Sequence, residues 1–560
     1  MKRLSPRSIS LLVVIGVFLL ALLILLLLPP RSDYRFPPAL RTKDEGTTDL
    51  SDRAIVAGED YGPESGSHSR ARTVYHDLQM PVDENFTSNL PIVVLDTEGS
   101  RPHRQLEWSS EYDSYVLKSD AYEYVEGTMK LLSCAKGTNT LLDKPAAESS
   151  ILIRIRGNSS VNYDKHQYLL KLTDANGKAN RQDLLRMGAD SEWILNCSFI
   201  DKSLLRNYLA YTVAGQLNEY TPDVRYCELV WKDGDEYHYD GVYLLCESVK
   251  VSKSRVNLPR FSENAQNLPF LLRRDRYNPK GVMLENYAER NQLLYGGLEV
   301  KWPEESRLND QVLSRITAQI DGFEEALFAE DYEDFIRYRD YIDVDSFVDY
   351  LILNEYFANY DAGFNSTYIY SDYSGKLHMG PVWDYDGAVD NYQNESLKTD
   401  STAFHDAPWF RQILRDPEFT VDVMERYAEL RESILSDESL DEFIDATVAG
   451  LGSAVDRDWA RWGYFYRDGS YLKNDDGDET DRNTITYGEE IEKIKTVLAE
   501  HGAWLDEHFD SLYQFSDPNA PQPADDDDDS VIRRGHVLAV VYMAIFFISV
   551  ILVQRMDRGL

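Results

Sequence analysis

The chain contains 560 residues, of which 58 are basic and 96 acidic, and its formal net charge is −38. A surface of that charge repels nucleic acid, so we expect no nucleic-acid partner and at most a local basic pocket for phosphate. The 37 tyrosines and 9 tryptophans are typical of a packed core and argue against a disordered chain. The 4 cysteines include no C-x-x-C pair, which argues against a zinc site; disulfides and buried thiols both stay open, with thiols favoured.

Apolar runs lie close to both ends of the chain. Ile9 to Leu28 carries no charge, follows a short basic terminus over residues 1–8, and is long enough to cross a bilayer core of about 30 Å. No A-x-A cleavage site follows it, so it predicts an uncleaved transmembrane signal anchor. Val537 to Val553, followed by a short basic tail over residues 554–560, predicts a second transmembrane helix.

Two such spans would attach the protein to the membrane through both termini and place both termini on the same side. Basic residues flank the spans on both sides, so charge alone does not orient them. The signal-like N-terminus favours a two-pass protein of the cell membrane whose large domain is extracytoplasmic.

Between the spans, composition separates a folded region from two linkers. Residues 29–89 are rich in Ser, Gly, Pro and charge and have no sustained apolar period, which predicts a polar linker. Residues 516–536 combine several prolines with the acidic run Asp525 to Asp529, which predicts an extended Pro/Asp linker. The folded domain is therefore expected over residues 90–515.

Strand patterns come first in this domain and helical patterns later. Apolar or alternating runs predict strands at 90–95, 151–155, 168–172, 227–231 and 241–246. Helical periodicity predicts helices at 201–217, 309–328, 343–360, 417–435, 440–461 and 488–509, with Asp201 as N-cap of the first. This order predicts an α+β fold with a strand-rich N-terminal part and a helical C-terminal part, an arrangement that suits a two-lobed nucleotide transferase.

A turn rich in small polar residues follows the strand at 151–155. Gly157 allows the backbone to turn sharply or to approach a ligand closely, and Asn158 supplies a small donor beside it. Nearby cations come from Arg156, Lys165 and Lys171, and the combination suits phosphate oxygens. An ordinary hairpin with a polar turn explains the same residues, and on this cluster alone it is the better interpretation.

A second cluster consists of Asp201, Arg206, Asn207 and Glu247. An acid at the end of an apolar strand is costly to bury without a partner. We therefore expect Glu247 to pair with one of three cations, Lys165, Lys171 or Arg206. A structural ion pair is the simpler interpretation of this cluster.

The segment from Asn354 to Asp386 predicts a helix end, a loop, a hairpin and a second loop. The hairpin turns near Ser374-Gly375, and a hairpin returns the chain to its own starting point. Four side chains should therefore converge: Asp361 and Asn365 from the first loop, and Asp384 and Asp386 after the returning strand. Ligands that offer only oxygen favour Mg²⁺ or Mn²⁺ over zinc. Turn-stabilising Asx residues are the alternative interpretation.

Protein kinases use the same order of loop acid, nearby Asn, hairpin and second acid. Four motifs make the chain resemble the CotH kinase family, the atypical protein kinases named for spore coat protein H. They are RIRGNSS with KHQYLLKL, WILNCSFIDKSLLRN, GVYLLCES, and NEYFANYDAGFNSTYIY through GPVWDYDGAVDN. The resemblance spans residues 90 to 400, with a weaker likeness continuing to 515.

The resemblance implies an altered, two-lobed kinase fold that binds ATP with Mg²⁺ or Mn²⁺ and phosphorylates Ser or Thr of a protein. The chain lacks G-x-G-x-x-G, H-R-D and D-F-G as ordinary kinases have them. The implied site residues are Asp361 as the catalytic acid, Asp384 and Asn365 as metal ligands, and Lys165 or Lys171, with Glu247 as its partner, at the phosphates. Asp386 is a further candidate metal ligand because of its place after the hairpin.

Three functions stay open at this point. The leading one is a membrane-tethered kinase that acts with ATP on an envelope or coat protein. The second is a non-catalytic surface module that binds or scaffolds through a kinase-like fold, for which the many Tyr and Trp residues are suited. The third is a divalent-metal hydrolase that uses Asp361, Asp384 and Asp386 without ATP.

Overall fold

The computed structural model describes residues 80–520 except 104–105, 110–113, 118–122, 135–136, 158, 277–280, 285–296, 394–395, 470 and 473–481. Both predicted spans, Ile9–Leu28 and Val537–Val553, lie outside these residues. Within the described part, no helix is both long and apolar enough to cross a bilayer. The chain divides into two compact units, Met1–Asp517 and Pro518–Leu560, and every helix and strand given below belongs to the first.

The first half of this unit is dominated by one eight-stranded sheet. Its strands are β1 (Met80–Val82), β3 (Ile92–Asp96), β6 (Val125–Leu132), β8 (Ala147–Ile155), β9 (Tyr168–Thr173), β12 (Glu192–Asn196), β13 (Val224–Asp233) and β14 (Glu236–Glu247). They are ordered β1-β14-β12-β9-β8-β6-β3-β13, and β13 also pairs with β14, so the hydrogen bonding closes on itself as in a barrel. The predicted alternation over 151–155 is confirmed, because every second residue of that stretch is buried. β1 lies within the range predicted as a linker, and it pairs with β14.

Three short strand pairs form separate two-stranded sheets in the same half of the unit. They are β2 (Thr87–Ser88) with β7 (Asn139–Thr140), β4 (Leu106–Ser109) with β5 (Ser114–Leu117), and β10 (Gln182–Asp183) with β11 (Ala189–Asp190). Of the cysteines, Cys197, Cys227 and Cys246 are buried free thiols in or beside the sheet. The buried-thiol interpretation is confirmed for these three.

A second, five-stranded sheet carries the predicted hairpin. Its strands are β15 (Phe270–Asp275), β16 (Val282–Met283), β17 (Gly297–Trp302), β18 (Thr367–Ser371) and β19 (Leu377–Met379), in the order β16-β17-β15-β18-β19. The hairpin β18–β19 turns where the sequence predicts, with Gly375 at φ 81° donating its N–H to the Asp372 carbonyl. The pairing of β18 with β15 anchors the hairpin to a strand from an earlier part of the chain.

The helices are α3 (Arg206–Leu217), α5 (Asp310–Leu327), α6 (Tyr332–Phe335), α7 (Val344–Tyr356), α8 (Phe410–Ile413), α9 (Pro417–Arg431), α10 (Asp437–Leu451), α11 (Ser453–Tyr466) and α12 (Tyr487–His508), with 3₁₀ turns η3 (Ser159–Asn162), η4 (Glu305–Arg307), η5 (Ile336–Asp340) and η6 (Phe509–Phe515). Side-chain caps begin several of them: Asn309 accepts from the Val312 N–H at 2.9 Å, and Thr486 forms a capping box with Glu489.

Two predicted helices have different limits. The single helix expected over 440–461 is two helices, α10 and α11, because the chain breaks at Gly452, where φ is 51° and ψ is −137°. The helix expected to start after Asp201 begins only at Arg206. The Asp201 carboxylate instead accepts from the Arg206 N–H at 2.8 Å, which closes a turn before the helix.

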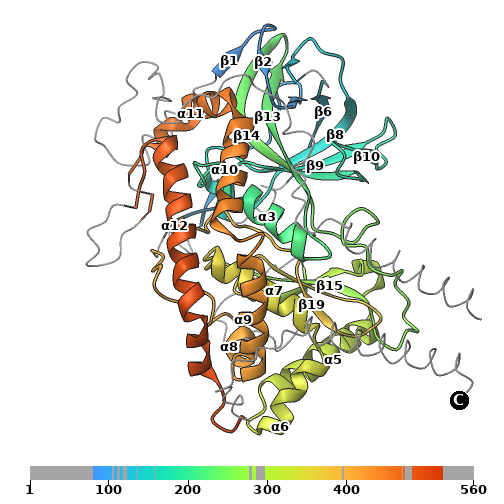
Figure 1. Cartoon of the computed structure of the whole chain (residues 1–560). Helices are drawn as coiled ribbons and strands as arrows, with labels where there is room; N and C mark the ends of the chain where they lie inside the picture. Colours follow the sequence, from blue (N-terminus) through green and yellow to red (C-terminus); the bar gives the residue numbers. More distant parts are fainter. Residues whose placement is uncertain are drawn as a thin grey trace, which may run out of the picture. The chain divides into compact units, whose positions relative to one another are not determined.

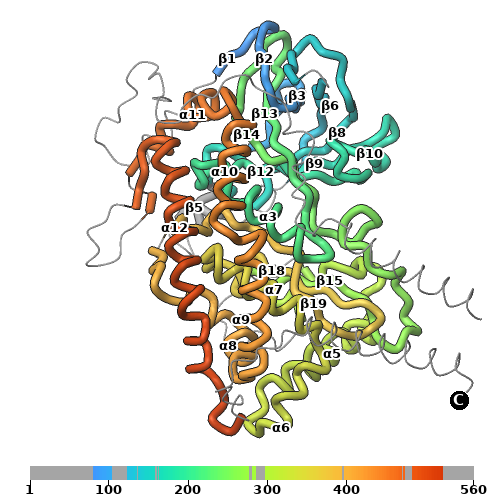
Figure 2. The backbone as a smooth tube through the Cα atoms, in the orientation of Figure 1, coloured from blue at the N-terminus to red at the C-terminus, as the bar shows by residue number. Residues whose placement is uncertain are grey.

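Figure 1 shows the closed sheet gathered at one end of the unit and helices α5 to α9, with the five-stranded sheet, at the other. Helix α3 lies between the two groups, and α11 packs on β14, while α12 contacts both α10 and α7 (Figure 2). The expected α+β architecture is confirmed. One late helix departs from the expected division into two parts, since α11 packs on the first sheet.

Candidate functional site

The loop after α7 holds Asp361 in a fixed geometry. Helix α7 is buried along most of its length and stops at Tyr356, and the chain then turns through Ala358 at φ 46°. The Asp361 carbonyl accepts from the Asn365 N–H at 2.8 Å, and its Oδ1 accepts from Asn365 Nδ2 at 3.0 Å. Asp361 and Asn365 are therefore paired within one tight turn.

The hairpin brings Asp384 back to this loop, as the sequence predicts. Ser366, the residue before β18, donates its hydroxyl to Asp384 Oδ2 at 3.2 Å. Asp384 has φ 69°, a left-handed conformation that costs most residues about 1 kcal/mol but is tolerated by Asp and Asn. Its N–H donates to the Tyr211 hydroxyl on α3 at 3.0 Å. Asp384 is thus anchored from the loop and from α3 at once.

The three carboxyl groups of the site influence one another. Burial raises the pKa of Asp361. Burial, and then the nearby charge of Asp361, raise the pKa of Asp384 to about 6, and the Arg156 guanidinium opposes this rise. Burial and the proximity of Asp384 raise the pKa of Asp386 well above its ordinary value. We call Asp361, Asn365, Asp384 and Asp386 the acid cluster.

The acid cluster fits a divalent cation by the chemistry of its donors. Its side chains offer only oxygen toward a cation, and repulsion between neighbouring carboxylates is what a bound Mg²⁺ or Mn²⁺ offsets. Asn365 commits its amide nitrogen to Asp361, so its amide oxygen is the atom left for a metal. In the part of the chain that the structure describes, no group of three acidic, His or Cys side chains is already arranged as a metal site.

Of the predicted phosphate-binding cations, Arg156 lies at the acid cluster. Its guanidinium stacks over the Trp383 ring at 5.0 Å, next to Asp384, and it donates to Gln167 Oε1 at 3.1 Å. The turn that delivers it requires glycine, since Gly157 has φ 119° and a Cβ there would lie 1.8 Å from Ser160 Oγ. Asn158 lies outside the described residues.

The two predicted lysines lie elsewhere. Lys165 is fully buried and donates at 2.7 Å to Asp458 of α11, which also accepts from the Val242 N–H. Lys171, on β9, places its ammonium 4.8 Å from the centre of the Tyr124 ring. Neither lysine has a contact with the acid cluster among the interactions of the described residues.

Glu247 has a different partner from those expected. It pairs with Arg255, not with Lys165, Lys171 or Arg206, and accepts from the Asp223 N–H at 2.9 Å. The reason is proximity in the chain: the segment after β14 folds back and places Arg255 beside the strand end. The prediction that this acid meets a cation is confirmed, and the identity of the cation is corrected.

Three side chains at the cluster were not singled out from the sequence. Ser366 and Tyr211 bond to Asp384 as described, and burial followed by the charges of Asp386 and Asp384 raises the pKa of Tyr163, which places that ring near both acids. Tyr163 lies in the sequence between Arg156 and Lys165, so the motif that contains these two cations could have identified it as a residue near the site. Tyr211 follows the LLRN motif by one helical turn, where only the three-dimensional packing reveals its role.

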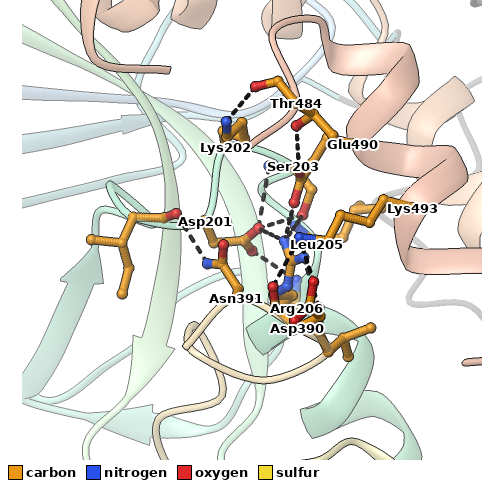
Figure 3. Close-up of polar contacts among 12 residues, drawn as sticks. Asp201, Lys202, Ser203, Leu205, Arg206, Asp390, Asn391, Thr484, Glu490 and Lys493 are labelled. Atoms are coloured by element: carbon orange, nitrogen blue, oxygen red, sulfur yellow. Dashed lines mark hydrogen bonds and ion pairs between the residues drawn. The ribbon is translucent and has the colours of Figure 1, made fainter. Parts of the chain in front are cut away.

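Arg206 fastens the loop that follows the acid cluster. Its Nη1 donates to Asp201 Oδ1 at 2.8 Å and to Glu490 Oε1 of α12 at 2.7 Å (Figure 3). Its Nε and Nη2 donate to the carbonyls of Ala388 and Val389 at 2.8 and 3.0 Å. The side chains of Arg206 and Asp201 are completely buried. Arg206 thus joins α3, α12 and the chain just beyond Asp386.

The same loop is held by a second set of charges. Asp390, at φ 55°, pairs with Arg482 at 3.1 Å and with Lys493 of α12 at 2.8 Å. The neighbouring Asn391 donates to the carbonyl of Asp386 at 2.7 Å. Figure 3 shows Asp390, Asn391 and Lys493 close to Arg206. The backbone that carries Asp386 is therefore fixed on both sides by buried polar contacts.

A strand-rich part, a helical part and an acid cluster on a loop and hairpin fit the architecture expected of a kinase-like protein. The family model described as CotH kinase protein matches residues 153–505. The chain belongs to the CotH kinase family. A comparison with curated proteins gives no match.

The raised pKa of Asp384 has a consequence for stability. Because the folded protein holds this proton more tightly than the unfolded chain, whose reference pKa is 3.8, ionisation of Asp384 opposes folding as the pH rises through about 6. Asp384→Asn removes the charge and keeps a residue that tolerates positive φ. We expect it to raise the free energy of unfolding at pH 7.5 by about 1–3 kcal/mol and to change it little near pH 4.

Urea unfolding at both pH values measures this change. The same samples with 10 mM Mg²⁺ provide the second readout: the cation should stabilise the natural protein and leave the Asn variant unaffected, because the ligand that holds it is gone. A destabilised Asn variant at pH 7.5 would show that the charge of Asp384 is compensated in a way the acid cluster does not explain.

Proposed function

We propose that this CotH family member is a protein kinase that transfers the γ-phosphate of ATP to Ser or Thr of an envelope or coat protein. The observation that carries the proposal is the convergence of Asp361 and Asp384 at the foot of the β18–β19 hairpin, with Arg156 opposing the rise of the Asp384 pKa. Kinases require this pair of acids, one for the attacking hydroxyl and one for the metal.

Asp361 is the residue that orients the acceptor hydroxyl and takes its proton. Its Oδ1 is held by Asn365, which fixes the direction in which the carboxylate faces. The elevated pKa of Asp361 makes it a better base than an exposed Asp. Arg156 is placed to bind phosphate oxygens, since its guanidinium carbon lies 5.0 Å from the centre of the Trp383 ring, beside Asp384.

Asp384, Asn365 and Asp386 would hold Mg²⁺ or Mn²⁺. When bound, the cation supplies positive charge to the phosphate oxygens of ATP. The Arg206 contacts keep the backbone after Asp386 in place, so these ligands need little rearrangement to bind.

We further propose that the domain is tethered to the cell membrane through Ile9–Leu28 and Val537–Val553, with the kinase domain on the extracytoplasmic side. The support is the apolar character of both segments and the signal-like basic terminus. The net charge of −38 further suits a substrate with basic residues around the accepting Ser or Thr.

The direct test is transfer of labelled γ-phosphate by the purified full chain, with Mg²⁺ or Mn²⁺, to casein and to a basic model protein. We expect label on Ser or Thr of at least one acceptor, and none after the divalent cation is chelated. Binding of ATP without transfer to any acceptor would favour the non-catalytic scaffold instead. Release of product from a phosphate ester without ATP would favour the metal hydrolase.

A further inference from the structure

A separate small pocket lies where β14 ends. It is partly open to solvent and is lined by Thr221, Glu247, Ser248, Arg255 and Pro381, among others. None of its lining residues belongs to the acid cluster. The walls come from three places: the segment after α3, the end of β14 with the loop that follows it, and the chain just before Trp383 and Asp384.

Several polar atoms of this cavity are buried without a partner. Arg255 is 8% exposed, and its Nε and Nη2 have no hydrogen-bond acceptor among the described residues. Ser248 is 5% exposed, and its hydroxyl and that of Thr221 likewise have no partner there. Proteins rarely bury such groups unpaired because each loses its bonds to water, so unpaired donors that line a cavity point to a missing acceptor.

The rest of Arg255 is firmly positioned. Its Nη1 donates to Glu247 and to the Met187 carbonyl at 3.2 Å, and the guanidinium stacks over the Trp193 ring at 4.6 Å. These contacts occupy the Nη1 nitrogen and one face of the Arg255 guanidinium group. The edge formed by Nε and Nη2 is the edge that binds carboxylate and phosphate in a bidentate manner.

The charge of the cavity also favours an anion. Burial raises the pKa of Glu247 to about 8, against the lowering effect of Arg255. A Glu247 carboxyl that holds its proton more tightly offsets less of the positive charge of Arg255. The other charged groups at this pair are Asp190, Asp223, Arg181 and Arg225.

We propose that this cavity binds a small oxyanion, a carboxylate or phosphate group, through Nε and Nη2 of Arg255 and the hydroxyls of Ser248 and Thr221. Such a ligand links the strand-rich part of the domain, through Ser248, to the segment that carries Asp384, through Pro381. This anion site lies outside the acid cluster, and binding there does not require that the acid cluster transfers phosphate.

The test is titration of the full chain with inorganic phosphate and, separately, with acetate at constant ionic strength, followed by calorimetry. Saturable binding of at least one anion is expected. Binding of phosphate would indicate a phosphate ligand, and binding of acetate would indicate a carboxylate ligand. Ser248→Ala removes one donor to a charged ligand and should weaken binding about tenfold or more. Ser433→Ala, which removes a hydroxyl bonded to the Glu429 carbonyl far along the chain, is the matched control and should leave binding unchanged.

A further variant separates this cavity from the acid cluster. Arg156→Met removes the cation proposed to bind the phosphates of ATP and should leave the anion affinity of the cavity as it was. If the natural protein binds the anion but does not bind ATP, the proposed kinase function fails and this inference stands. The inference is overturned if Ser248→Ala binds as the natural protein does, if Arg156→Met abolishes binding, or if neither anion binds saturably.

Discussion

Asp361→Asn is expected to lower the rate of phosphate transfer by about 10²–10⁴-fold while leaving the affinity for ATP with Mg²⁺ nearly unchanged. The Asn side chain keeps an oxygen that accepts the bond from Asn365 Nδ2, so the loop stays in place. It loses the ability to take the proton of the attacking hydroxyl. The loss therefore falls on kcat and not on binding.

Steady-state transfer kinetics and calorimetric titration of ATP, each on both proteins, separate the two effects. The control is Asp372→Asn in the hairpin turn, where the carboxylate accepts from the Ser374 N–H at 2.7 Å. This variant makes the same chemical change outside the acid cluster and should retain full activity. If Asp361→Asn transfers phosphate as fast as Asp372→Asn, the role assigned to Asp361 is wrong.

Arg206→Met is expected to lower the free energy of unfolding by about 3–5 kcal/mol. The substitution leaves Asp201 and Glu490 buried without their cation and leaves the carbonyls of Ala388 and Val389 without a donor. Uncompensated charges in a completely buried position carry a large desolvation cost. Urea unfolding followed by tryptophan fluorescence measures the loss.

The control for Arg206 is Arg426→Met. Arg426 pairs with Asp349 at 2.8 Å, and its side chain is 36% exposed. One buried carboxyl, that of Asp349, loses its cation, so this change should cost less than Arg206→Met, about 1–2 kcal/mol. Adding Glu490→Gln to Arg206→Met should restore part of the stability, because it removes one of the two stranded charges. An Arg206 variant as stable as the Arg426 variant would show that the buried network contributes little.

The hairpin part of the site could be predicted because its information is local. Only a short stretch of chain separates Asp361 from Asp384, and it contains the turn at Ser374-Gly375. In a tight hairpin the second strand runs back beside the first, so the residues before and after the hairpin lie close together. The position of Gly157 was predictable for the same reason, since no other residue suits a sharp turn with φ 119°. Local turn chemistry therefore located the acids and the turn that delivers Arg156.

The partners of the buried cations could not be predicted, because they come from distant parts of the chain. Lys165 meets Asp458, which is 293 residues away, and Arg206 meets Glu490, which is 284 residues away. Both partners lie on helices late in the chain. The sequence pattern of such a helix predicts which face is apolar, but not which distant residue its polar side chains contact. The position of Lys165 near a glycine turn predicts a phosphate ligand, whereas the packing of α11 against β14 gives its ammonium a buried carboxylate partner.

The topology of the first sheet shows the same limit. β13 pairs in parallel with β3 and antiparallel with β14, which closes the sheet. Each of these strands has an apolar pattern that fits several neighbours, so the pattern predicts strands without their order. The α+β class followed from the order of strands and helices along the chain, whereas the closure depended on contacts between distant segments.

The most direct test of the central claim, that the acid cluster is a nucleotide and metal site, is calorimetric titration of the full chain with ATP and Mg²⁺ at millimolar concentrations. We predict saturable binding that requires the divalent cation, is lost in Asp384→Asn and persists in Asp372→Asn. No ATP binding by the natural protein, or equal binding by the Asp384→Asn variant, would contradict the account.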